Sequence, residues 1–237
     1  MKLLSRVSQK VAKVKHATKL FSRDIRSRVK NQFSRRGQAP ISQEVFNHKK
    51  FAHLGYESSD KPGVFEQKLR GTGYSLDPSL SNEETKVFHN PHTKEVTVAY
   101  RGTALNKPSR WKDVRSDLAI LTGTERHDKR FKEANRHFKG VTDKYGDYNI
   151  STTGHSLGGQ IAKHVNDSHK GKVKKNVVFS RGTGLFEPFR KKQENTVDVS
   201  NQHDLISLGA RLQGGNQVVE TKHKGLLESH NLGALFH

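Results

Sequence analysis

Residues 150–159, which read Ile-Ser-Thr-Thr-Gly-His-Ser-Leu-Gly-Gly, constrain this chain more than any other stretch. Gly154, Ser156 and Gly158 have the G-x-S-x-G spacing of a nucleophile elbow, with a β-branched run before them and a helix-like segment over 160–165 after them. The serine of such an elbow stands at a sharp strand-to-helix turn, and the two glycines let strand and helix approach without a clash. The spacing predicts that Ser156 is a nucleophile at a helix N-terminus, where N–H groups and the helix dipole would stabilise an oxyanion.

The rest of the pattern alternates strands with helices. Strands are expected at 95–101, before Ser156, at 176–180 and at 196–200, with an edge strand at Val218 and Val219. Helices are expected over 111–121 and 126–140, whereas 41–93 reads as helix and loop with an apolar face of Phe46, Phe51 and Leu54. This alternation predicts an α/β fold with a mostly parallel central sheet that is covered by helices on both faces.

A serine nucleophile needs a base, and the base needs an orienting acid. In chains with this elbow the order is serine, then Asp or Glu, then His. Asp204 follows the strand expected at 196–200, and His230 lies near the C-terminus, so this order is present. The chain has 14 histidines, of which His203, His223 and His237 are the competing bases.

The first 40 residues differ from the remainder and are predicted to be a basic amphipathic arm with a linker, ahead of a domain over 41–237. The arm holds 12 Lys and Arg against the single acid Asp24, and so carries +11 of a formal net charge of +20. Its apolar residues recur at steps of three and four, as a helical stripe requires. Three interpretations remain open: contact with an anionic membrane or nucleic acid, an organellar transit peptide, or a helix docked on the body or on an oligomer partner.

Composition sets further limits. The chain has no cysteine, which excludes disulfides and thiolate metal sites. No run of about 18 apolar residues is present, and the first residues lack the apolar core of a secretory signal. We therefore expect an intracellular or virion-associated protein that is peripheral to membranes.

Two motifs in order are similar to those of the class 3 lipase family. Tyr100-Arg101-Gly102-Thr103 matches the R-G-T/S motif that closes a strand, and Trp111 and Asp113 follow it; the G-H-S-L-G-G elbow comes about fifty residues later. The resemblance extends more weakly over 45–236. It implies an α/β-hydrolase fold and hydrolysis of carboxylic esters.

Residue by residue, the resemblance implies a triad of Ser156, Asp204 and His230. Oxyanion-hole N–H groups would come from Thr103 and Leu157, and Asp117 would hold the Thr103 side chain. No metal or cofactor is expected. For Arg101, a buried structural pair is favoured over contact with substrate, while Trp111 and Leu121 fit a lid and the core equally well.

The expected substrate is a lipid or other ester at a membrane or droplet surface, and the positive charge favours anionic or phospholipid interfaces. The alternative is a nucleic-acid- or virion-associated basic protein on a lipase scaffold, with the arm as its binding element. Such binding would be blind to sequence, because the arm offers no aromatic platform for stacking bases.

Overall fold

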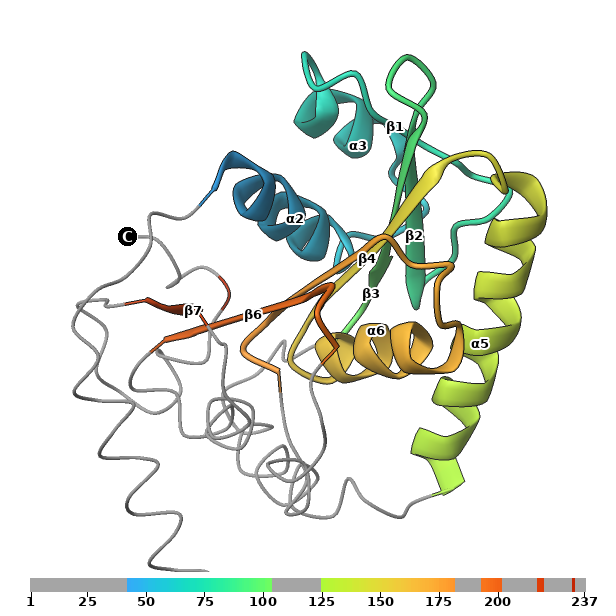
Figure 1. Ribbon diagram of the computed structural model, residues 1–237. Helices are drawn as coiled ribbons and strands as arrows, with labels where there is room; N and C mark the ends of the chain where they lie inside the picture. The colour runs from blue at the N-terminus through green and yellow to red at the C-terminus, as the bar shows by residue number, and fades with distance from the viewer. Residues whose placement is uncertain (1–41, 104–124, 182–192, 202–216, 220–231, 233–237) are drawn as a thin grey trace, which may run out of the picture. The chain divides into compact units, whose positions relative to one another are not determined.

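The computed structural model describes residues 42–103, 125–181, 193–201, 217–219 and 232 (Figure 1). The predicted arm over 1–40 and the helix predicted over 111–121 lie outside the described residues. Four helices are described: α2 (Gln43–Leu54), α3 (Pro62–Leu69), α5 (Glu125–Lys144) and α6 (Leu157–Ser168). The strands are β1 (Ser75–Leu76), β2 (Thr85–Asn90), β3 (Glu95–Tyr100), β4 (Asn149–His155), β5 (Lys175–Phe179), β6 (Thr196–Asn201) and β7 (Gln217–Val219).

These strands form one sheet in the order in which they occur along the chain, β1 to β7. The first three strands pair antiparallel, and β3 to β7 are parallel. Parallel neighbours need a crossover, which α5 provides between β3 and β4 and α6 provides between β4 and β5. The carboxyl ends of the parallel strands therefore meet at one edge of the sheet, where open α/β sheets carry their sites.

Helices cover both faces of the sheet, as Figure 1 shows. On one face α5 and α6 pack against Val96, Val98 and Val178 through an apolar stripe that includes Phe138 and Ile161. On the other face α2 and α3 cover strand residues one step out of phase with these, such as Ala99, Val177 and Phe179. Because successive strand side chains point to opposite faces, one short strand supplies both layers of the core.

The first two helices, α2 and α3, begin at residues that favour a helix N-terminus. Ser42 caps α2, with its hydroxyl accepting the Val45 amide hydrogen at 3.4 Å, and Pro62 opens α3, where its missing N–H costs nothing. The apolar face that was predicted for α2 is correct for Phe51 and Leu54 but wrong for Phe46, which is 45% exposed. Val45 and Ala52 are buried in its stead.

The reading of 41–93 as helix and loop was wrong for β1 and β2. The strand β2 is buried on both faces, with Val87 in one core layer and Phe88 in the other, so its sequence has no simple alternation. Lys86, the second residue of this strand, is fully buried and donates through Nζ to the Asn82 carbonyl oxygen at 2.6 Å. A buried lysine hides a strand from any pattern based on hydrophobicity.

The strands predicted at 95–101, 176–180, 196–200 and 218–219 are confirmed as β3, β5, β6 and the edge strand β7. The helix predicted over 126–140 is confirmed and is longer, as α5. Among the described helices, none is both long and apolar enough to cross a bilayer.

Candidate active site

The predicted strand, turn and helix around Ser156 are confirmed. The strand β4 ends at His155 and α6 begins at Leu157, so that Ser156 alone makes the turn. Its φ of 55° and ψ of −121° lie where residues with a Cβ rarely go, at a cost of about 1–3 kcal/mol. The Ser156 amide donates to the Phe179 carbonyl at the end of β5, 3.0 Å away, which ties the turn to the neighbouring strand.

The glycines on either side of the serine are required by contact. A Cβ on Gly154 would lie 2.4 Å from the carbonyl carbon and oxygen of Gly158, so strand and helix touch backbone to backbone. A Cβ on Gly158 would lie 2.1 Å from the Tyr100 carbonyl oxygen and 2.9 Å from the Gly102 nitrogen. The first turn of α6 therefore packs directly on the segment that leaves β3.

A mostly parallel sheet covered on both faces, with a strained serine between a central strand and its helix, decides the fold class. The chain has the α/β-hydrolase fold. In this fold the nucleophile stands at the carboxyl edge of the sheet, which is where Ser156 lies.

The two predicted oxyanion donors lie on neighbouring segments. Leu157 is the first residue of α6 and is buried, while Thr103 is exposed and follows β3 by three residues. Gly102 and Gly158, the residues next to them, meet in the backbone contact described above. The structure therefore brings the Thr103 segment to the elbow.

Asp204, His230 and Asp117 lie outside the described residues, so the rest of the predicted triad and the support for Thr103 stay predictions. Two described residues lie close in sequence to Asp204 and to His230. The strand β6 ends at Asn201, three residues before Asp204, at the same edge of the sheet as Ser156. Leu232, two residues after His230, is buried in the core layer that includes Val177 and Phe179.

Tyr56 is a contact of the elbow that no sequence pattern indicated. Its hydroxyl lies 3.0 Å from His155 Nδ1 and would lie 2.3 Å from a Cβ on Gly102. Burial raises the pKa of Tyr56 well above its usual value, and this outweighs the lowering by a hydrogen bond with the Gly102 backbone. Tyr56 is therefore a neutral phenol that joins the end of α2, the end of β4 and the segment after β3.

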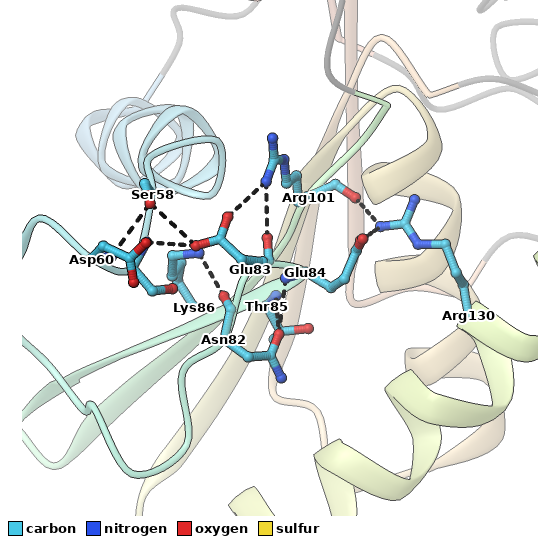
Figure 2. Close-up of polar contacts among 10 residues, drawn as sticks. Ser58, Asp60, Asn82, Glu83, Glu84, Thr85, Lys86, Arg101 and Arg130 are labelled. Carbon is cyan, nitrogen blue, oxygen red and sulfur yellow. Dashed lines mark hydrogen bonds and ion pairs between the residues drawn. The ribbon is translucent and has the colours of Figure 1, made fainter.

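Arg101 forms a structural ion pair, as favoured from its sequence context, but the pair is not buried as was expected. Its Nη1 lies 3.0 Å from Glu83 Oε2 (Figure 2), and the side chains of Arg101 and Glu83 are 22% and 52% exposed. Arg130 of α5 donates through Nη2 to the Arg101 carbonyl oxygen at 2.7 Å and also pairs with Glu84. The residue before the glycine of the R-G-T motif is thus held through its side chain and its backbone.

A second ion pair near the elbow is almost completely buried. Arg181, two residues past β5, places Nε and Nη2 at 3.0 and 2.9 Å from Asp198 Oδ2 on β6, with both side chains no more than 2% exposed. The Arg181 Cβ also lies 3.4 Å from where a Cβ on Gly159 would be. Charged residues are seldom buried in this way, so no sequence pattern predicted the pair. Within the described ranges, no group of three or more His, Asp or Glu could hold a metal ion.

Comparisons with known proteins identify no family for this chain. No family model matches the chain, and no curated protein matches its sequence. Among solved structures, it is similar to the Lip2 lipase from Yarrowia lipolytica, with 18% identity, a TM-score of 0.47, and coverage of 72% of this chain and 77% of that one. It is also similar to lipase II from Rhizopus niveus, with 12% identity, a TM-score of 0.47, and coverage of 73% of this chain and 79% of that one. A third similar structure is a triacylglycerol lipase whose catalytic centre is described as a serine protease triad. The identity is 14% and the TM-score 0.48, with coverage of 72% of this chain and 76% of that one.

Proposed function

We propose that this protein is a serine carboxylic-ester hydrolase, of the lipase or phospholipase type, that works through an acyl-enzyme. The observation that carries the proposal is the strained Ser156 at the N-terminus of α6, next to the segment that ends in Thr103. A serine held in this conformation presents its hydroxyl at the edge of the sheet, and the cost of the conformation is understandable if the hydroxyl reacts.

In the proposed reaction His230 takes the proton of Ser156 as the serine oxygen attacks the ester carbonyl. Asp204 holds the imidazole in the correct tautomer and stabilises the imidazolium. The N–H groups of Leu157 and Thr103 bind the oxyanion, and one such donor contributes about 2.7–4 kcal/mol. His230 then protonates the leaving alcohol, and water activated by the same histidine hydrolyses the acyl-enzyme.

We further propose that the enzyme works at anionic lipid surfaces. Besides the basic arm, α5 exposes four basic residues at steps of three and four on one helical face: Lys129, Lys132, Arg136 and Lys139. Each basic residue close to an anionic bilayer contributes about 1 kcal/mol of attraction, so this face and the arm would concentrate the enzyme on such a surface.

The test is hydrolysis of p-nitrophenyl esters of graded chain length, together with phosphatidylcholine and phosphatidylglycerol vesicles. Ser156→Ala should lower turnover by several orders of magnitude while leaving the fold intact. Ser168→Ala is the matched control, because this exposed serine ends the same helix. Faster hydrolysis of the phosphatidylglycerol vesicles would support the preference for anionic surfaces.

The triad assignment has its own test. His230→Ala should abolish turnover, whereas His223→Ala should not. If activity survived Ser156→Ala, or followed His223 and not His230, the assigned residues would be wrong. Absence of turnover on every ester, combined with salt-dependent retention on DNA, would favour the nucleic-acid-binding alternative.

A further inference from the structure

The segment that leaves β3 is held at Arg101 by three groups of contacts, and Figure 2 draws those of the side chain and of the carbonyl oxygen. The Arg101 amide donates to the Glu84 carbonyl oxygen at 2.9 Å. The Arg101 side chain reaches the carboxylate and the carbonyl oxygen of Glu83, at 3.0 and 3.4 Å. The Arg101 carbonyl oxygen accepts from Arg130 Nη2 at 2.7 Å. Glu83 and Glu84 lie directly before β2, whereas Arg130 lies on α5.

Arg130 makes two contacts with one end of its guanidinium group. Nη2 donates to the Arg101 carbonyl oxygen and also contacts the Glu84 carboxylate, and the Arg130 side chain is only 17% exposed. A planar guanidinium fixes the angle between two such contacts, whereas the ammonium of lysine is a rotating point charge. Arg130 thus restrains the direction of the Arg101 carbonyl, and with it the plane of the peptide between Arg101 and Gly102.

That peptide plane is one unit before the peptide that carries the Thr103 N–H. Between them is Gly102, which has no side chain and is confined by the Tyr56 hydroxyl, the His155 carbonyl and the Gly158 helix turn. With Gly102 confined on these sides, the orientation of the Arg101 carbonyl determines where the Thr103 N–H points.

We propose that Arg130 is a positioning residue for the reaction, which acts through the Arg101 carbonyl to aim the Thr103 N–H at the oxyanion. The inference rests on the proposed function. An oxyanion donor works within about 2.7–3.1 Å of the oxygen, and a displacement of about 1 Å can cost about 100-fold in rate. Removing Arg130 should therefore slow the chemical step and leave the binding of substrate unchanged.

Glu84 has a lesser part in this arrangement. Its carboxylate is 59% exposed, and an exposed ion pair contributes little. Its backbone carbonyl, which accepts from the Arg101 amide, does not depend on the side chain. Glu84→Gln should therefore keep most of the activity, and this separates the carbonyl contact from the ion pair.

The experiment compares Arg130→Met, Arg130→Lys and Glu84→Gln with Arg70→Met, a change of an exposed arginine directly after α3. The readouts are kcat and KM for a soluble short-chain p-nitrophenyl ester, the rate at which a fluorophosphonate labels Ser156, and the melting temperature. For Arg130→Met we expect kcat about 10- to 100-fold lower with KM within about twofold, and labelling slowed in parallel. Arg130→Lys should fall between Arg130→Met and the wild type, and Arg70→Met should match the wild type.

Three results would overturn the inference. One is a wild-type kcat and labelling rate in Arg130→Met. Another is a loss of activity that matches the fraction unfolded and disappears at lower temperature, which would make Arg130 a structural residue only. If Arg130→Met does not fold, a wild-type kcat in a stable Arg130→Lys has the same meaning. A wild-type protein that neither hydrolyses esters nor takes up the label would instead refute the proposed function, and the inference with it.

Discussion

The elbow at Ser156 and the cluster around Asp77 are both tightly packed, but they are held together by different means. At the elbow the contacts are between backbone atoms, and Gly154 and Gly158 are required because nothing larger fits. At Asp77 one buried carboxylate accepts hydrogen bonds from Lys144, Tyr145 and Ser79 at 2.7–2.8 Å. The shape of the elbow therefore does not depend on the ionisation of a side chain, whereas the Asp77 cluster requires a charged carboxylate.

The Arg181–Asp198 pair places buried charges beside the elbow, so it tests whether the elbow is independent of ionised side chains. Asp198→Ala would leave Arg181 buried without its carboxylate and should cost about 3–5 kcal/mol of unfolding free energy, measured by denaturant titration. Asp147→Ala is the control, since Asp147 and Lys94 form a fully exposed pair. Equal midpoints for the two variants would show that the buried pair does not support the elbow.

Gly158→Ala tests the steric side of the comparison. The new Cβ would lie 2.1 Å from the Tyr100 carbonyl oxygen, so either α6 or the end of β3 must move. We expect a loss of about 3 kcal/mol, at the upper end for an overpacked site, and loss of ester hydrolysis.

Gly140→Ala is the control for that change. Gly140 lies inside α5, and an added Cβ would meet only Leu80 Cδ2, at an ordinary 3.8 Å. Alanine should therefore stabilise the protein by about 0.5–1 kcal/mol. If both glycine variants had the same stability, the elbow would not be under the tight backbone constraint described here.

Asp77→Asn tests the electrostatic side and should have the smallest effect of the three. Burial alone would raise the pKa of Asp77, but the hydrogen bonds from Lys144, Ser79 and Tyr145 together lower it to about 2. A folded-state pKa below the unfolded value of about 3.9 means that the stabilisation is complete above about pH 4 and is lost as pH falls towards 2.

The wild type should therefore exceed Asp77→Asn by about 2 kcal/mol at pH 7, as expected for hydrogen bonds to a charged group, and the difference should shrink between about pH 4 and pH 2. Denaturant titrations at several pH values measure it. A difference that stayed constant across this range would mean that the carboxylate charge is not what holds the cluster together.

The sequence predicted the parts of this molecule whose residues are distinctive locally. The elbow was predictable because Gly154 and Gly158 flank Ser156 at fixed spacing, and β3 because its apolar residues Val96, Val98 and Tyr100 alternate along the strand. The strand β2 was missed because it carries the buried Lys86. Tyr56 and Arg130 could not be found either, since their roles depend on contacts with residues 99 and 29 positions away.

The strained backbone of Ser156 creates a trade-off between the stability of the fold and the proposed catalysis. Glycine adopts a φ of 55° without strain. Ser156→Gly would therefore remove the backbone strain at the residue that is proposed to carry the reaction. Selection for heat resistance alone would therefore favour an inactive protein. A more robust and still active form would have to gain its stability elsewhere, and the interior of α5 at Gly140 is such a place.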